Sequence, residues 1–136
     1  MDYRTLSKKA AAARRYSHSP YSHFRVGAAL LTKSGKVYTG CNIEISSFAL
    51  TLRAERTALF KAVSEGEKAF QAIAVATDED GFTAPCGACR QVIMDLAGDI
   101  DFVMSKKTGE ILVLKMSELF PYPFGSKNFL RRSKKS

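Results

Sequence analysis

The order in which strand patterns and helical patterns follow one another is the strongest constraint on the fold of this chain. Strand patterns are short apolar runs between turn residues, and helical patterns are longer stretches of helix-forming residues. In chain order, the sequence predicts a helix over 3–16, strands over 24–30 and 37–42, a helix over 52–65, a strand over 72–77, a helix over 86–96, strands over 100–104 and 111–114, and a short helix over 117–120. This order predicts one five-stranded mixed sheet with helices packed on it, a three-layer α/β/α fold.

Two local patterns add detail to this fold. The last two strands are joined by the turn 106–109, which is too short for a crossover helix, so they must run antiparallel. Apolar residues alternate along the strand over 24–30, and the helix over 52–65 carries an apolar stripe that we expect to face the sheet. The alternating residues are Phe24, Val26, Ala28 and Leu30, and the stripe residues are Leu52, Leu59, Phe60 and Val63.

The length and composition limit the class of protein. A chain of 136 residues that is 46% hydrophobic can bury one core but not two, so we expect a single domain over 1–136, with 126–136 as a basic, flexible tail. No apolar stretch approaches the ~18 residues of a membrane span, and residues 1–4 lack the pattern of a signal peptide. We therefore predict a cytoplasmic location and no membrane partner.

The net charge of +8 could indicate a nucleic-acid partner, because clustered Lys and Arg neutralise phosphates. Here the basic residues lie at 8–9 and 14–15 in the first helical pattern and in the tail. A solvated helix face and a basic terminus account for this distribution, so no nucleic-acid partner is predicted.

Two of the three cysteines form the motif Cys86-Gly87-Ala88-Cys89 at the expected start of a helix. The first turn of a helix brings both thiols and the free backbone N–H groups to one place, and the helix N-terminus favours the thiolate. Such a pair is half of a zinc site. A thioredoxin-like redox pair is the alternative, but it normally follows the first strand of a βαβ unit, whereas this pair lies past the middle of the chain.

Glu55 is a functional candidate only together with its neighbours, because a single Glu on a helix is usually a solvated carboxylate. Zinc deaminases combine a His or Cys two residues before a Glu with a later Pro-Cys-x-x-Cys, and here the Glu and the second motif are both present. Four segments extend the match: PYSHFRVGAALLT (20–32), GCNIE (40–44), AERTALFKAVSEG (54–66) and PCGACRQV (85–92). In this order and spacing the chain closely resembles the small homotetrameric zinc-dependent cytidine deaminases.

The resemblance implies hydrolytic deamination of cytidine and deoxycytidine to uridine and deoxyuridine in pyrimidine salvage. It also implies a Zn²⁺ cofactor, a homotetramer and a small pyrimidine nucleoside as the ligand. Cys86 and Cys89 match two zinc ligands, and Glu55 matches the proton shuttle. Zinc would lower the pKa of a bound water that attacks C4 of cytosine, and Glu55 would move protons to N3 and to the departing amine.

Substrate-binding residues also follow from the resemblance. Asn42 and Glu44 match the ribose-binding pair, and their spacing in an extended chain turns both side chains the same way. Phe24 matches an aromatic residue beside the base, although a place in the core explains it equally well. Backbone groups near Ala54 and Cys86 are expected to bind the base edge.

Two further residues match positions outside the immediate site. Phe124 matches a residue that reaches the pocket of the neighbouring subunit, which would make the oligomer part of the active site. Arg56 matches an arginine that hydrogen-bonds the ligand thiolates and offsets their charge.

Arg53 departs from the family pattern, because it stands where these enzymes have a Cys and related deaminases a His. A guanidinium has no lone pair to offer and stays protonated, so it cannot bind zinc. Replacing a thiolate by a cation also moves the local charge by two units in the positive direction. We therefore expect this chain to bind zinc weakly or not at all and to deaminate poorly.

Three interpretations of Arg53 stay open at this point. Zinc could be held by Cys86, Cys89 and waters or a borrowed ligand; the site could be empty, with Arg53 paired to the thiolates or to Glu55; or the substitution could be an inactivating or engineered change. Borrowing is difficult, because strand alternation turns Cys41 and His23 away from the pocket, and only His18 lies in a loop without such a constraint.

Two rival functions belong to other classes. The first is a metal-free nucleoside-binding or regulatory paralogue, which the Arg53 substitution suggests. The second is a polynucleotide deaminase or an RNA-binding module. The short turn before Ile111 and the closing segment at Phe124 argue against this second rival, because a polymer substrate needs an open pocket mouth.

Overall fold

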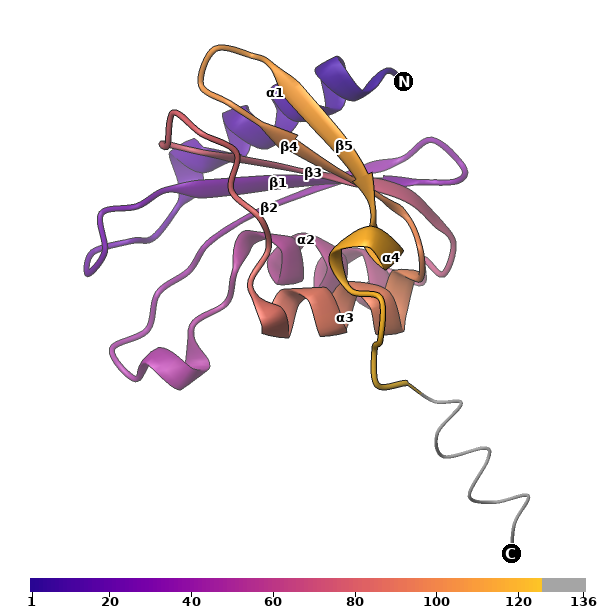
Figure 1. Cartoon of the computed structure of the whole chain (residues 1–136). Helices are drawn as coiled ribbons and strands as arrows, with labels where there is room; N and C mark the ends of the chain where they lie inside the picture. The colour runs from indigo at the N-terminus through magenta and orange to yellow at the C-terminus, as the bar shows by residue number, and fades with distance from the viewer. Residues whose placement is uncertain (126–136) are drawn as a thin grey trace, which may run out of the picture.

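Five strands form one mixed sheet in the order β2-β1-β3-β4-β5 in the computed structural model, which describes residues 1–125 (Figure 1). β3 and β4 run parallel, and the other neighbouring strands pair antiparallel. The predicted mixed sheet and its antiparallel last pair are confirmed. The strands are β1 (Val26–Thr32), β2 (Val37–Cys41), β3 (Phe70–Thr77), β4 (Asp101–Ser105) and β5 (Ile111–Lys115).

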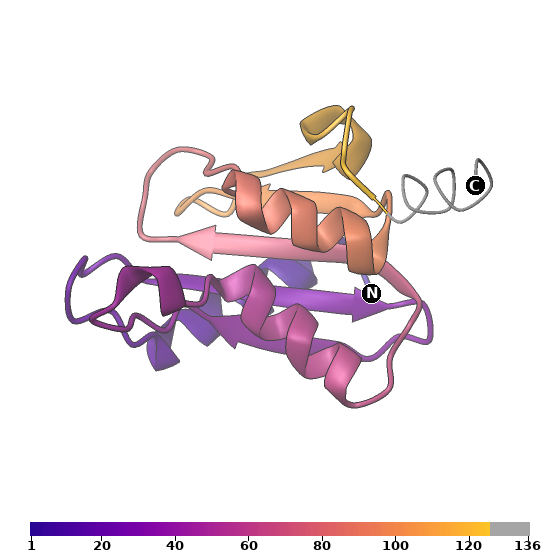
Figure 2. The ribbon, with the colours of Figure 1, turned by 90° about the horizontal axis from the view of Figure 1, so that it is seen from below.

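Helices cover both faces of the sheet, as the three-layer prediction requires. α1 lies on one face, and α2 and α3 lie side by side on the other (Figures 1 and 2). Among residues 1–125, no helix is long and apolar enough to cross a membrane. The predicted basic tail over 126–136 lies outside the described residues. The α-helices are α1 (Tyr3–Ala13), α2 (Ala54–Ser64), α3 (Gly87–Ala97) and α4 (Met116–Leu119), and short 3₁₀ turns span Arg14–Tyr16 and Phe48–Leu50.

Two hydrophobic clusters fill the spaces between the layers. One lies between the sheet and the α2–α3 layer and includes Leu30, Leu59 and Phe102, and the other lies under α1 and includes Leu6 and Leu31. Because both faces are covered, all seven residues of β1 are buried, not only the alternating ones. Phe24 precedes β1 and packs, partly buried, against the first cluster.

The face that α2 turns to the sheet differs from the predicted apolar stripe. Leu59 is fully buried, but Phe60 and Val63 are 40% and 38% exposed, and Leu52 precedes the helix. The buried positions of α2 are mainly alanines: Ala54, Ala58 and Ala62. The physical reason is close packing of backbones. A Cβ on Gly40 of β2 would lie 2.5 Å from Ala58 N, so only small side chains fit between α2 and β2.

α1 approaches the opposite face of the sheet just as closely. A Cβ on Gly27 would lie 2.0 Å from Ala10 O, so glycine is required where α1 crosses β1. The helix is capped by Asp2, whose side chain accepts a hydrogen bond from Thr5 N at 2.8 Å. The close contact at Gly27 therefore fixes the distance between α1 and the sheet.

Candidate functional site

The first turns of α2 and α3 lie at the same end of the sheet (Figure 2). Arg53 is the N-cap of α2 and Cys86 is the N-cap of α3, and neither side chain makes a capping hydrogen bond. The free N–H groups of two first turns and the positive ends of two helix dipoles are therefore directed toward one region. This arrangement favours anions, thiolates and electron-rich ligand atoms.

Glu55 and the two predicted zinc-binding thiols are brought together in this region. Glu55 is only 5% exposed, and burial raises the pKa of its carboxyl, although its own backbone N–H, Arg53, Arg56 and Cys89 act in the opposite direction. Cys89 is fully buried, and burial together with the charge of Glu55 raises the pKa of its thiol. A carboxyl that retains its proton more readily than usual suits proton transfer.

The pKa of the Cys86 thiol is shifted in the opposite direction from that of Cys89. Burial disfavours its thiolate, but hydrogen bonding from the backbone and side chain of Cys89 and the positive charge of Arg53 outweigh burial and lower its pKa. The N-cap position of Cys86 contributes to the same preference. Within the pair, Cys86 is therefore the more acidic thiol.

A pocket of about 550 Å³ opens beside these groups. Six residues named from the sequence line it: Phe24, Asn42, Glu44, Arg53, Arg56 and Cys86. Its volume is in the usual range for small-molecule sites. Four other predicted residues do not line it, and two of these, Glu55 and Cys89, are buried next to Cys86. Ala54 is fully buried, and Phe124 lines a separate hollow next to Phe60 and Gln91, where Gln91 Nε2 donates a hydrogen bond to Phe124 O at 2.7 Å.

Glu44 is held as an ionised acceptor on the wall of this pocket. Its Oε1 accepts hydrogen bonds from the backbone N–H groups of Tyr21 and Ser22, both at 3.1 Å, and its Oε2 accepts from the Ser22 hydroxyl. The hydrogen bond from the Ser22 side chain is the main cause of the lowered pKa of Glu44, and burial opposes it. The remaining lone pairs of this carboxylate are available to a ligand hydroxyl.

Asn42 is fixed by protein contacts to a greater extent than the sequence suggests. Its Oδ1 accepts hydrogen bonds from Val26 N at 3.0 Å and from Ser17 Oγ, and its Nδ2 donates to Phe24 O at 2.7 Å. The acceptor of this side chain is therefore already used. What Asn42 can offer a ligand is the second hydrogen of Nδ2.

Four pocket residues were not named from the sequence. They are Ser22, which orients Glu44, and Phe48, Ala49 and Thr51, which come from the loop that enters α2. Ser17, outside the pocket lining, orients Asn42. Ser22 lies within the segment PYSHFRVGAALLT, which was the one available signal. Phe48 and Thr51 belong to no periodic pattern, because the turn Phe48–Leu50 is short and irregular.

The chain matches known proteins along most of its length. Residues 1–105 match the family model described as the cytidine and deoxycytidylate deaminase zinc-binding region. The chain belongs to this family. It is 49% identical over 125 residues to a cytidine deaminase of Halalkalibacterium halodurans, covering 91% of this chain and 95% of that protein. It is 47% identical over 122 residues to a probable cytidine deaminase of Dictyostelium discoideum, covering 89% and 82%.

Solved structures of deaminases share the fold. The crystal structure of cytidine deaminase from Burkholderia pseudomallei superposes with a TM-score of 0.88 at 44% identity, covering 91% of this chain and all of that chain (100%). Cytidine deaminase from Mycobacterium tuberculosis gives a TM-score of 0.80 at 34% identity and covers 92% of this chain and 98% of its own. The deaminase fold predicted from the motifs is therefore confirmed.

The donor set of this deaminase does not fit the three-ligand zinc centre expected of the family. Among residues 1–125, no group of three His, Cys, Asp or Glu side chains could hold a metal ion. Arg53 lies at the position where a third ligand would precede Glu55, and its guanidinium has no lone pair to donate. Cys86 and Cys89 alone supply half of a tetrahedral site.

The borrowed ligands considered from the sequence do not complete the set. Cys41 is buried, and the one charge that perturbs its pKa, besides the effect of burial, is that of Lys61. His18 is exposed, and its backbone forms an isolated β-bridge with Ile43. His23 is exposed and adopts a φ of 58°, with its N–H bonded to Ser19 O at 3.0 Å.

Arg56 is placed differently from Arg53. Its Nη2 donates to Thr51 O at 3.2 Å, and its Nε is buried with no hydrogen-bond partner within residues 1–125. Its charge acts to lower the pKa of both Glu55 and Cys89, against the larger effect of burial, and Arg56 lines the pocket together with Cys86. This is the position from which an arginine can offset negative charge on a thiolate.

Proposed function

We propose that the chain acts in hydrolytic deamination of cytidine and deoxycytidine in pyrimidine salvage. The observation that carries the proposal is the buried Glu55 carboxyl beside Cys86 and Cys89, next to a pocket of about 550 Å³. The proposal is supported by the identity of the chain to proteins named cytidine deaminase, which is 49% over 125 residues in one case.

In this proposal Glu55 is the proton carrier. Because burial raises its pKa, its carboxyl holds a proton more readily than an ordinary glutamate and can deliver it to N3 of the pyrimidine ring. The Glu55 carboxylate then takes one proton from the attacking water and passes it to the departing amine. The remaining hydroxyl proton returns to Glu55 as the C4 carbonyl of the product forms. The backbone around Ala54 and Cys86 presents the free N–H groups of two helix starts to the base edge.

The ribose is the proposed partner of Glu44 and Asn42. Glu44 accepts hydrogen bonds from sugar hydroxyls, and Asn42 donates through the second hydrogen of Nδ2. Phe24 packs against the base while it also contacts the core. Because the loop residues Tyr21 and Ser22 hold Glu44 in place, ribose binding depends on that loop.

We further propose that Arg53 makes this chain a poor zinc binder and a slow deaminase. Its positive charge lies next to Cys86 and Glu55, where a divalent ion would be repelled. A second candidate function rests on the same residue: a zinc-poor, nucleoside-binding form of the same fold, with the pocket retained and turnover lost. The other roles proposed above stay the same in both cases.

The oligomer and the location complete the proposal. The exposed apolar side chains include Phe48 and Leu50 near the start of α2 and, in a separate hollow, Phe124. Such side chains suit a homotetramer in which Phe124 reaches the pocket of a neighbouring subunit. Three free cysteines suit the reducing cytoplasm. Light scattering on the full chain measures the oligomer directly.

The test is a comparison of binding and turnover in one preparation. The purified full chain is incubated with cytidine, with and without added zinc, while released ammonia and bound nucleoside are measured. We expect nucleoside binding, slow ammonia release that depends on zinc, and loss of that release in Glu55→Gln but not in the matched exposed variant Glu65→Gln. Binding without any release supports the second candidate function, and absence of both contradicts the deaminase proposal.

A further inference from the structure

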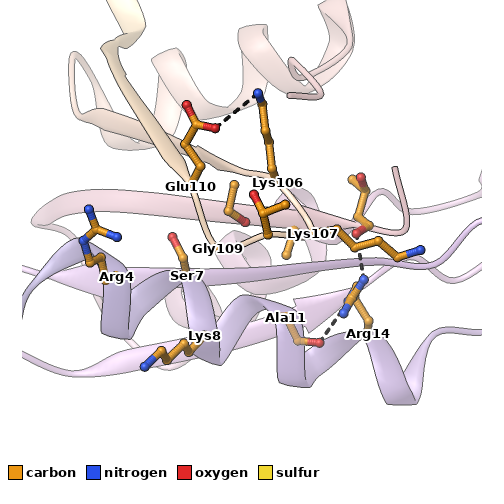
Figure 3. Close-up of a pocket in the computed structure, with 13 residues that line it drawn as sticks. Arg4, Ser7, Lys8, Ala11, Arg14, Lys106, Lys107, Gly109 and Glu110 are labelled. Atoms are coloured by element: carbon orange, nitrogen blue, oxygen red, sulfur yellow. Dashed lines mark hydrogen bonds and ion pairs between the residues drawn. The ribbon is translucent and has the colours of Figure 1, made fainter. Parts of the chain in front are cut away.

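A second pocket lies on the face of the sheet opposite the site at Glu55. It has a volume of about 660 Å³ and is formed by α1, the ends of β3 and β4, and the turn between β4 and β5 (Figure 3). α1, whose residues line this pocket, lies on the face of the sheet opposite α2 and α3 (Figure 1). Nothing in the proposed deamination uses this pocket.

The lining of this pocket is strongly basic. Five basic side chains and one carboxylate, Glu110, line it. Two of the basic groups have acidic partners, because Lys106 pairs with Glu110 at 3.3 Å and Arg14 with Asp78 at 3.1 Å. The other three basic side chains form no ion pair within residues 1–125: Arg4, Lys8 and Lys107.

A buried hydroxyl points into the pocket without a partner. Ser7 of α1 is only 6% exposed, and its Oγ has no hydrogen-bond partner among residues 1–125. Figure 3 shows this hydroxyl directed from α1 toward the turn at Gly109. The two other buried hydroxyls of the lining are both engaged, since Ser105 Oγ donates to Val75 O at 3.1 Å and Thr77 Oγ1 contacts Thr83 Oγ1 at 3.5 Å.

A buried hydroxyl without a partner is uncommon in proteins, and a bound ion or water is one explanation of it. Here the pocket lining includes three basic side chains that have no carboxylate partner in the described part of the chain, so a negatively charged acceptor would be favoured. Phosphate oxygens meet both requirements, because they accept hydrogen bonds from hydroxyls and pair with Lys and Arg. The volume exceeds that of one phosphate group and falls within the range of small-molecule sites.

We propose that this pocket binds a small anion with several phosphate groups, with Ser7 donating to a phosphate oxygen and Arg4, Lys8 and Lys107 neutralising the charge. A free polyphosphate and the phosphate chain of a nucleoside triphosphate share this chemistry. Binding at this pocket is independent of the proposed deamination, since none of the nucleoside-pocket residues takes part.

The experiment is calorimetric titration of the full chain with inorganic phosphate, tripolyphosphate and ATP without magnesium, in a phosphate-free buffer at two salt concentrations. We expect tripolyphosphate and ATP to bind more tightly than phosphate and to weaken as salt rises. Equal affinity for the two indicates that the phosphate chain alone is recognised, and tighter ATP binding indicates that the rest of the nucleotide also occupies the pocket. Binding should not change when cytidine is present.

Variants locate the site. Arg4→Gln/Lys107→Gln should weaken tripolyphosphate binding about tenfold or more, since hydrogen bonds to charged groups are worth that much. The matched control Lys9→Gln/Lys68→Gln removes the same charge from exposed positions outside the pocket and should leave affinity within about twofold. Ser7→Ala should also weaken binding several-fold, yet the free protein should be at least as stable as the parent chain, because an unpartnered hydroxyl is removed.

Three results would overturn the proposal. The first is absence of tripolyphosphate and ATP binding at millimolar concentration. The second is an equal loss of affinity in the control pair. The third is a short DNA duplex that binds more tightly than both small anions with a steep salt dependence, which would assign the basic surface to nucleic acid.

Discussion

Arg53 and Cys86, the N-cap residues of α2 and α3, line the same pocket, and the charge of Arg53 adds to the hydrogen bonding from Cys89 that outweighs burial and lowers the pKa of the Cys86 thiol. The charge of Arg53 acts on both Cys86 and Glu55. The pattern of zinc deaminases has a metal ligand two residues before the Glu, and this chain of the family has the cation Arg53 at that position. The identity of residue 53 should therefore control metal binding.

The first prediction is that Arg53→Cys converts the site into one that holds zinc. The substitution adds a third thiolate and removes a positive charge, so zinc affinity should rise by at least about a hundredfold, more than changes in groups that merely support a ligand produce. Cytidine deamination should rise with it. Metal analysis of the purified protein and ammonia release from cytidine measure the two effects.

Arg53→Ser separates the effect of the added thiolate from the effect of the removed positive charge, because it removes the cation without adding a strong ligand. We expect it to raise zinc affinity much less than Arg53→Cys. One tightly held zinc per chain in the parent protein would contradict the proposed effect of Arg53. Full zinc loading of Arg53→Cys without any gain in deamination would instead argue against the proposed roles of Glu55 and its neighbours.

The second prediction concerns Glu44. Glu44→Gln retains the shape of the side chain but removes its charge, so nucleoside binding should weaken about ten- to a hundredfold, the range for a hydrogen bond to a charged group. Equilibrium dialysis with cytidine measures the change, and circular dichroism checks the fold. Glu67→Gln is not a suitable comparison because Glu67 is partly buried and contacts Tyr38, so the exposed Glu79→Gln serves as the control. Unchanged binding would assign Glu44 to positioning the Tyr21–Ser22 loop alone.

The sequence predicts the starts of the two helices that build the site to within two residues, at 52 and 86 against Ala54 and Gly87 in the structure, because proline and runs of helix-forming residues are local signals. It therefore predicts that Glu55 and the Cys86–Cys89 pair come together. It does not predict which face of α2 meets the sheet, because that face depends on how closely the backbones approach at Gly40. Nor does it show that Asn42 Oδ1 is used by Val26 and Ser17, since those contacts join segments distant in sequence.

The third prediction concerns Gly40. A Cβ at this position would lie 2.5 Å from Ala58 N and 2.7 Å from Ala54 O, so Gly40→Ala must push α2 away from β2. We expect a loss of about 1–3 kcal/mol in the free energy of unfolding, the range for overpacking, measured by urea denaturation. Because α2 also carries Glu55, nucleoside binding should weaken as well. Gly81→Ala is the control, since its Cβ would meet nothing within 4 Å, and an equal loss there would contradict the packing argument.

The last prediction is a pH dependence of stability that arises at the β4–β5 pair. Lys115 Nζ lies 2.7 Å from Asp101 Oδ1, and the hydrogen bonds from Lys115 and Tyr3 hold the pKa of Asp101 below its ordinary value. A lowered folded-state pKa stabilises the protein above the unfolded pKa of about 4, and this contribution disappears as pH falls through the folded value. Asp101→Asn should therefore be less stable than the parent chain at pH 7, and the difference in the free energy of unfolding should shrink as pH falls below about 4. Urea denaturation across this range tests it, and Asp95→Asn, an exposed carboxylate on α3, should show no such convergence.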